Sequence, residues 1–154
     1  MNVGEEFAEL SGLEQMRALM RSGRRPPIAE SLDFDLVEVE AGRAVFRGVP
    51  GPRAYNPIGS VHGGYAATLL DSACGCAVHA SLGRGQGYTT LELKVAYHRG
   101  LSAETGPVSA IGTVQTIGKR VAFAEARLVD ASGRLYASAT STLLVFERQA
   151  KLAA

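Results

Sequence analysis

The amino-acid sequence predicts an α+β fold in which a curved antiparallel sheet wraps around one long central helix. Residues 61–82 form the longest apolar segment, and they are apolar on nearly every side of a helix. Strand-like segments flank this helix, two before it and four after it. A helix that is apolar all round must be covered all round. We therefore expect a strongly curved sheet on one side of it and a second copy of the chain behind it.

The remaining elements follow from periodicity and from turn residues. Residues 5–21 carry apolar side chains at helical spacing, and Gly23 and Pro26-Pro27 end this predicted helix. Residues 33–49 read as two strands joined by a turn at Gly42, and residues 51–59 read as a loop. The four later strands are predicted at 89–99, 108–117, 121–129 and 135–146. We expect one domain over residues 1–154, with an N-terminal helix within 1–25 and the core within 33–147.

Composition narrows the class of protein. A formal net charge of +1 argues against a sequence-independent nucleic-acid binder. No apolar run reaches the roughly 18 residues of a membrane span, and no secretory signal is visible at the start. The two cysteines, Cys74 and Cys76, point to different sides of one helix, so we expect them to be reduced and buried. The sequence thus favours a cytoplasmic protein with no metal site and with neither a nucleic-acid nor a membrane partner.

One narrow stripe of the long helix is polar or small. It contains Thr68, Ser72, Gly75 and His79 together with Asp71, the only acidic residue of the helix, all within roughly 100° of arc. An ionised carboxylate in apolar surroundings is costly unless something pairs with it. Asp71 is therefore either hydrogen-bonded at a subunit interface or held partly desolvated in front of a substrate.

The helix begins at His62-Gly63-Gly64. The first turn of a helix has backbone N–H groups without partners, and glycine lets a ligand approach them closely. This start suits an oxyanion hole, although tight packing or a helix cap would also explain the glycines. Gly63 and Asp71 are eight positions apart, about 12 Å along the axis. Two antiparallel helices across a two-fold axis would bring the start of one helix to Asp71 of the other.

These residues also match a known pattern. NPIGSVHGG at 56–64, followed by LLDS at 69–72, resembles the N-x-x-G-x-x-H-G-G…D motif of hotdog-fold acyl-CoA thioesterases. The nearest kind is the phenylacetate-pathway (PaaI-like) type, which is related to the 4-hydroxybenzoyl-CoA thioesterases. Residues 89–97 and 117–123 resemble later strands of that family, and the whole resemblance runs from about residue 34 to residue 146.

The resemblance implies hydrolysis of an acyl- or aryl-CoA thioester to the free acid and CoA. Asp71 matches the nucleophile or general base, and Gly63 matches the backbone N–H that polarises the thioester carbonyl. Asn56 and His62 match loop residues near the thioester. Thr90 matches a hydroxyl residue that orients water, and a register error of one residue would exchange it with Thr89.

The resemblance also implies how the substrate is held and how the chains assemble. Gly64, Ser72 and Thr89 are expected substrate contacts. Because CoA carries phosphates, Arg99, Lys119 and Arg120 at strand ends and turns are candidate cations for it. We expect no cofactor apart from the CoA of the substrate, and a homodimer that pairs again into a homotetramer.

Two other functions fit the same fold. A hotdog enoyl-CoA hydratase would carry the signature Asp-x-Asn-Pro-x-His, but Ala54-Tyr55 precede Asn56-Pro57 here and His62 lies too far along the chain. A non-catalytic acyl-CoA-binding module would keep the fold and lose the carboxylate, and the presence of Asp71 argues against it.

Overall fold

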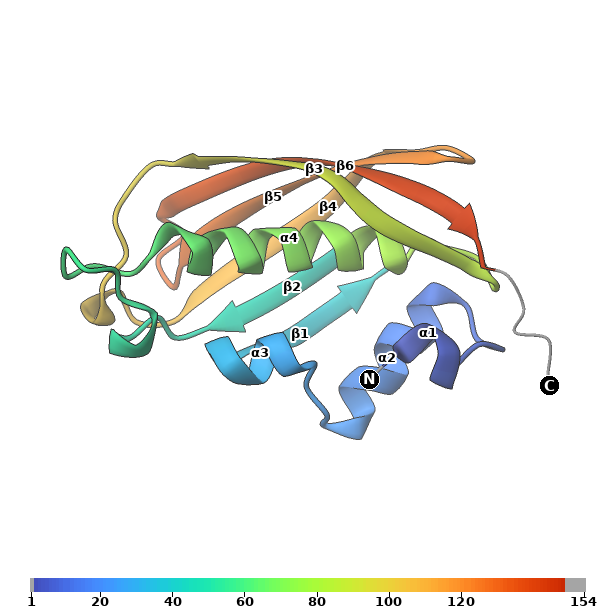
Figure 1. Ribbon diagram of the computed structural model, residues 1–154, viewed down its shortest axis with the longest axis horizontal. Coiled ribbons are helices and arrows are strands. Elements are labelled where there is room, and N and C mark those ends of the chain that lie inside the picture. Colours follow the sequence, from blue (N-terminus) through green and yellow to red (C-terminus); the bar gives the residue numbers. More distant parts are fainter. Residues whose placement is uncertain (1, 149–154) are drawn as a thin grey trace.

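The computed structural model describes residues 2–148 and has the predicted α+β architecture, a six-stranded sheet curved around helix α4 (Gly63–His79) (Figure 1). Every pair of neighbouring strands is antiparallel, in the order β1-β2-β4-β5-β6-β3. The strands are β1 Phe34–Glu40, β2 Arg43–Gly48, β3 Gln86–Tyr97, β4 Val108–Ile117, β5 Val121–Asp130 and β6 Leu135–Glu147. The predicted order of the elements from residue 33 onward is confirmed, with ends displaced by a few residues.

Small residues let α4 lie directly on the sheet. A Cβ atom built on Gly112 of β4 would lie 2.3 Å from the carbonyl oxygen of Ala73, so only glycine fits there. Alanines line both sides of this contact and are buried. They are Ala44, Ala110, Ala122, Ala124, Ala126, Ala137 and Ala139 on the sheet and Ala66, Ala73 and Ala77 on α4. Although α4 is long and apolar, no helix within residues 2–148 is both long and apolar enough to cross a membrane.

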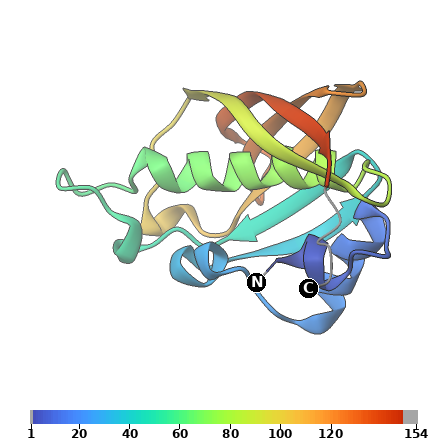
Figure 2. The same ribbon diagram turned by 45° about the vertical axis from the view of Figure 1, so that its right-hand side comes forward.

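Strand β3 forms one edge of the sheet. It has 12 residues and pairs with β6 on one side, and the sheet order ends with it. Figure 2 shows β3 and β6 passing over α4 on the side opposite to the N-terminal helices. A long edge strand presents a row of unpaired backbone groups, and such edges favour pairing with another strand.

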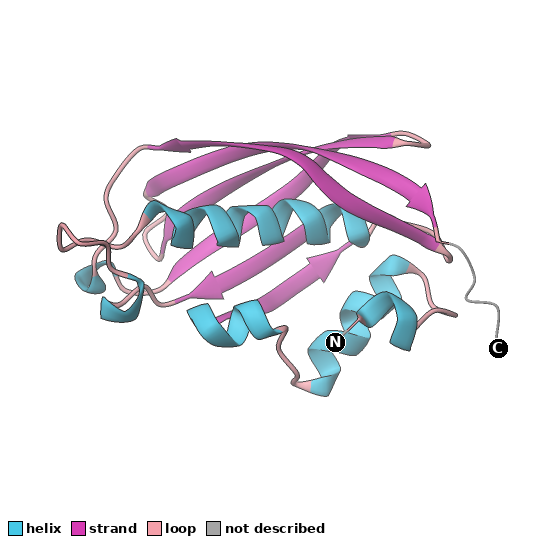
Figure 3. Cartoon of the chain, viewed as in Figure 1, coloured by secondary structure: helices cyan, strands magenta, loops and turns pink. Residues whose placement is uncertain are grey.

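The N-terminal region differs from the prediction. The single helix expected over residues 5–21 is wrong, because the structure has α1 (Val3–Glu6) and α2 (Gly12–Ser22) in its place (Figure 3). Ser11 separates them with a capping box, in which its hydroxyl accepts from the Glu14 N–H and its own N–H donates to the Glu14 carboxylate. Gly12 then packs against the end of α4 and donates its N–H to the Leu82 carbonyl at 3.0 Å.

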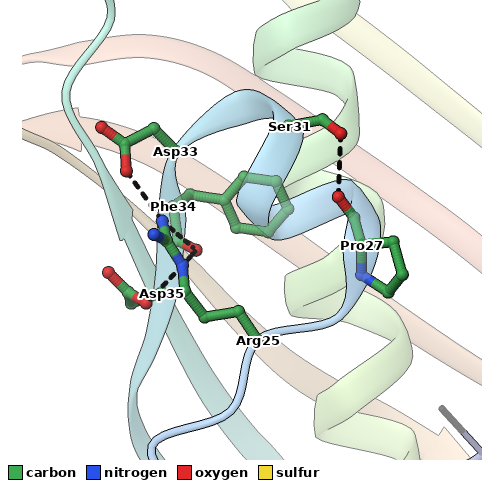
Figure 4. Close-up of polar contacts among 6 residues, drawn as sticks. All are labelled: Arg25, Pro27, Ser31, Asp33, Phe34 and Asp35. Atoms are coloured by element: carbon green, nitrogen blue, oxygen red, sulfur yellow. Dashed lines mark hydrogen bonds and ion pairs between the residues drawn. The ribbon is translucent and has the colours of Figure 1, made fainter.

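A third short helix, α3 (Pro27–Leu32), is absent from the prediction, which treats Pro26-Pro27 only as a stop. Proline is also favoured at the first position of a helix, and Pro27 occupies that position. The Ser31 hydroxyl donates to the Pro27 carbonyl within this helix, and Arg25 contacts Asp33, Asp35 and the Phe34 carbonyl beside it (Figure 4). These contacts fasten α3 to the start of β1.

A buried histidine joins α2 to α4. The Gln15 side-chain nitrogen donates to the carbonyls of Phe7 and Leu10, so its oxygen faces His79 and accepts from Nε2 at 2.8 Å. His79 therefore carries its proton on Nε2. The side chain is 8% exposed, and burial lowers the pKa of the imidazole from 6.5 to about 4. His79 thus belongs to the packing of the N-terminal helices.

We expect this histidine to make stability depend on pH. Between pH 6.5 and about 4, His79 is protonated in the unfolded chain but neutral in the folded chain. The free energy of unfolding is therefore highest above pH 6.5 and decreases as the pH falls below that value. The loss from pH 7.5 to pH 5 should be about 2 kcal/mol. Urea unfolding at the two pH values measures it. His79→Gln replaces the imidazole N–H donor with an amide N–H and cannot titrate. An equal loss of unfolding free energy in that variant would show that His79 does not cause the pH dependence.

Candidate active site

The first turn of α4 presents one free backbone donor. His62 is the N-cap, and its Nδ1 accepts from the Gly64 N–H at 2.8 Å. The Tyr65 N–H donates to the His62 carbonyl at 3.0 Å. Within residues 2–148 the Gly63 N–H has no acceptor. Since this end of the helix carries partial positive charge, Gly63 is suited to bind a carbonyl oxygen that becomes negative. Gly64, an expected substrate contact, has its N–H occupied by His62.

A cavity of about 330 Å³ lies beside Gly63. Its walls come from the start of α4, the end of β3 and the start of β6. They are Val61, His62, Gly63, Ala66, Tyr97, His98, Arg99, Gly100, Leu101, Tyr136 and Ala137. The candidate cation Arg99 thus lies at the same cavity as Gly63, where its guanidinium donates to the Leu135 carbonyl at 3.0 Å. Asp71 is not among the residues that line this cavity.

Asp71 lies two turns further along α4, on a half-buried part of the helix. The Thr90 hydroxyl of β3 donates to the Asp71 Oδ1 at 3.1 Å. Thr89 is exposed and lies opposite Leu144 in the sheet register, so it is on the face turned away from α4. Of the two neighbouring threonines, the structure therefore places Thr90 against the carboxylate. Ser72 is half-buried and follows Asp71 on the helix.

We expect Thr90→Val to lower kcat about tenfold, because the hydroxyl no longer orients the Asp71 carboxylate. Valine has nearly the same shape, so the sheet should remain intact. Thr140→Val, on the exposed face of β6, is the matched control. Steady-state hydrolysis rates of the two variants test this. Equal rates for Thr90→Val and the wild type would show that the contact does not assist the reaction.

Cysteine chemistry does not compete with Asp71 at this site. Burial, reinforced by the negative charge of Asp71, raises the pKa of the Cys74 thiol to about 12. Burial raises the pKa of the Cys76 thiol to about 12 as well, although a hydrogen bond with Tyr88 opposes this shift. A cysteine nucleophile requires a lowered thiol pKa. Both thiols are therefore protonated at neutral pH, which disfavours a cysteine nucleophile beside Asp71.

Asn56 organises the loop before the helix. Its side-chain oxygen accepts from the N–H groups of Ile58 and Ser60, both at 3.1 Å, and its side-chain nitrogen donates to the Ser60 hydroxyl at 3.1 Å. These bonds fold residues 56–60 into a compact turn. Asn56 does not line the cavity beside Gly63, so its contact with the thioester stays a prediction.

Lys119 and Arg120 lie far from Gly63 within one chain. Both are exposed in the turn between β4 and β5, which Figure 1 shows at the opposite end of the molecule from the start of α4. The contacts agree, because Gly42 packs beside both Val114 and Ser81, and Ser81 follows the end of α4. Within one chain, these two cations therefore do not line the cavity beside Gly63.

Sequence reasoning did not identify Tyr97, His98 or Tyr136 as cavity residues. The His98 Nε2 is 2.9 Å from the Ser138 hydroxyl, and the residue lines the cavity as well. All three lie where β3 leaves the sheet or where β6 begins. Tyr97 continues the alternation of Leu93 and Val95 in β3, but alternation alone does not indicate that a cavity lies beside these ends of the strands.

Known proteins share this fold. The family model of the thioesterase superfamily matches residues 58–137, just over half of the chain. A phenylacetic acid degradation-related protein of Ralstonia eutropha superposes with a TM-score of 0.74 at 27% identity, over 84% of this chain and 97% of its own. A mutant of the phenylacetic acid degradation protein PaaI of Thermus thermophilus gives 0.70 at 28% identity, over 80% and 100%.

A thioesterase of Haemophilus influenzae has the same fold, with a TM-score of 0.77 at 18% identity over 92% of this chain and 94% of its own. No curated protein sequence matches significantly. The chain belongs to the thioesterase superfamily. It is a thioester hydrolase of the hotdog fold and is similar to PaaI-like proteins.

Proposed function

We propose that this thioester hydrolase acts on acyl-CoA or aryl-CoA and that two chains build each active site. The observation that carries the proposal is the separation of the two reactive groups. The free Gly63 N–H opens on a cavity that Asp71 does not line, and Asp71 is held by Thr90 further along the same helix. A second chain that lies antiparallel would supply the Asp71 carboxylate to the first chain's cavity.

The reaction then follows from these groups. The thioester carbonyl oxygen accepts the Gly63 N–H, which stabilises the negative charge formed on that oxygen. The partner's Asp71 either takes a proton from a water that attacks the carbonyl carbon, or attacks that carbon itself to give an anhydride that water then opens. In both cases the C–S bond breaks, the CoA sulfur leaves and takes up a proton, and the acid is released. Both routes require ionised Asp71.

The exposed edge of β3 supports the dimer. Two copies of β3 paired across a two-fold axis would extend the sheet and place the two α4 helices side by side.

The predicted pairing of dimers has a candidate surface on the sheet face turned away from α4. There Val121 and Leu144 lie opposite each other, and Phe123, two residues further along β5, is 46% exposed. Light scattering of Phe123→Glu tests this second contact, since a tetramer would fall to dimers.

We also propose roles for three cations. Arg99 at the cavity would contact the phosphates of CoA, and Lys119 and Arg120 would reach those of a CoA bound to a neighbouring chain. We propose that no further cofactor takes part, that neither nucleic acid nor membrane is a partner, and that the protein works in the cytoplasm.

A free-thiol assay with a panel of acyl-CoAs tests the function. The panel should include short, medium and long acyl chains and aryl groups, each with and without enzyme. Release of thiol in proportion to enzyme is the expected result. Hydration of an enoyl-CoA without thiol would indicate a hydratase, and binding without either reaction would indicate a sensor. Either outcome would overturn the proposed activity.

A further inference from the structure

We infer that Tyr97 is a positioning residue for the Gly63 amide, a role that rests on the proposed function. Tyr97 is the last residue of β3, and its hydroxyl donates to the Gly63 carbonyl at 3.0 Å. Its ring lies against the same residue, since a Cβ atom built on Gly63 would be 3.0 Å from the ring carbon that bears the hydroxyl. One side chain therefore fixes Gly63 by a hydrogen bond and by contact.

Gly63 needs such support because of where it lies. Its N–H has no partner within residues 2–148, and the peptide unit that carries this N–H is held on its other side, where the His62 carbonyl accepts the Tyr65 N–H. The neighbouring N–H of Gly64 is fixed by His62, and the carbonyl of Gly63 is fixed by Tyr97. Catalysis by an oriented donor is sensitive to displacements of about 1 Å. The bonds from Tyr97 and to His62 fix the peptide unit that follows the free N–H, and the Tyr97 ring packs against the Cα between the two units, so Tyr97 limits the movement of Gly63 at the wall of the cavity.

Two residues of β3 make similar hydrogen bonds to α4. Thr90 near the start of the strand binds Asp71, and Tyr97 at its end binds Gly63. One strand thus orients both reactive groups of its own helix, each with a side-chain hydroxyl. In a dimer paired along β3, the Tyr97 end of one strand would meet the Thr90 end of the other, where the amide and the partner's carboxylate must converge.

A purely structural role for Tyr97 makes a different prediction. If the residue only packed the cavity wall, loss of the hydroxyl would leave catalysis unchanged, because the ring would remain. If it bound substrate directly, loss of the hydroxyl would raise KM. A positioning role lowers kcat and leaves KM nearly constant, since the amide acts mainly in the transition state.

The test compares Tyr97→Phe with Tyr65→Phe. Tyr65 lies two residues from Gly63, and its buried hydroxyl has no partner, so Tyr65→Phe removes the same atom without breaking a bond. With an acyl-CoA that the wild type hydrolyses, Tyr97→Phe should lose about tenfold in kcat with less than about a twofold change in KM. Tyr65→Phe should keep the wild-type values. The melting temperature and oligomeric size of both variants establish that they fold.

Combination with Gly63→Ala gives a second readout. Because the Cβ atom of Gly63→Ala already disturbs the contact between residue 63 and the Tyr97 ring, Tyr97→Phe should cost much less in a Gly63→Ala background than in the wild type. Wild-type kcat in Tyr97→Phe, or a rise confined to KM, would overturn the positioning role. Fully additive effects of the two substitutions would also overturn it. A wild-type protein that releases no thiol from any acyl-CoA would instead defeat the proposed function itself.

Discussion

Asp71→Asn should lower kcat by about a thousandfold or more while the protein stays folded. The amide is nearly identical in shape to the carboxylate, and its oxygen can still accept the Thr90 hydroxyl. It can neither take a proton from water nor attack the thioester, so both routes to hydrolysis are lost. Thiol release at saturating acyl-CoA measures the effect. The same large loss is expected for either route, because both require the carboxylate.

A matched control separates the loss of a negative charge from the loss of the catalytic carboxylate. Glu40→Gln neutralises an exposed carboxylate at the end of β1 and should leave turnover unchanged. Size-exclusion chromatography and thermal melting should give the same values for Asp71→Asn and the wild type. Near-normal turnover in Asp71→Asn would mean that another group activates the water, and the role of Asp71 would then be limited to packing between helices.

Gly63→Pro should lower kcat by about 10²- to 10³-fold, because proline lacks the N–H that we propose polarises the carbonyl. The substitution suits the site in other respects. Gly63 is the first residue of α4, where proline is favoured, and its N–H makes no bond within the described chain. His62 has φ −63° and ψ 136°, a conformation that a residue before proline adopts readily.

Gly63→Ala is the control for this experiment. Alanine introduces the same close contact with the Tyr97 ring and keeps the N–H. The difference in kcat between the two variants therefore reports the donor itself. If alanine and proline reduced kcat equally, the contact with Tyr97 would explain the loss, and the amide would have no special part in the reaction.

Asp71→Asn and Gly63→Pro together test whether each active site is built by two chains. In a dimer of one Asp71→Asn chain and one Gly63→Pro chain, one site contains both substitutions and the other contains neither. Random mixing should therefore restore about one quarter of the wild-type activity. Co-expression of two differently tagged chains allows this measurement. If mixed preparations stay inactive, each site must lie within one chain.

Much of the fold could be predicted because its signals are periodic. The apolar surface of α4 and the alternation in β4 and β5 identify those elements within a few residues. The N-terminal region could not be predicted in the same way. The helical spacing of apolar residues continues across the break at Ser11, and only the Ser11–Glu14 capping box indicates a new start. Pro27 reads equally well as the end of one helix and as the beginning of the next.

The candidate site was predictable where chemistry needs a particular residue type. Asp71 stands out as an acidic residue on an apolar helix, and the glycine pair marks the start of that helix. The choice between Thr89 and Thr90 required the strand register, which the bulge in β3 between Thr90 and Glu92 alters. Tyr97 gave no signal, because its contact with Gly63 joins residues 34 positions apart.

The alanine-lined contact between α4 and the sheet limits how the substrate range of this scaffold can evolve. Enzymes often accept a bulkier substrate after a large wall residue is trimmed to a small one. Where α4 lies on the alanines of the sheet and on Gly112, the facing residues are already small, so no further trimming is available there. New specificities must therefore arise from the loops, from the ends of the strands or from the N-terminal helices, while the layer beneath them stays constant.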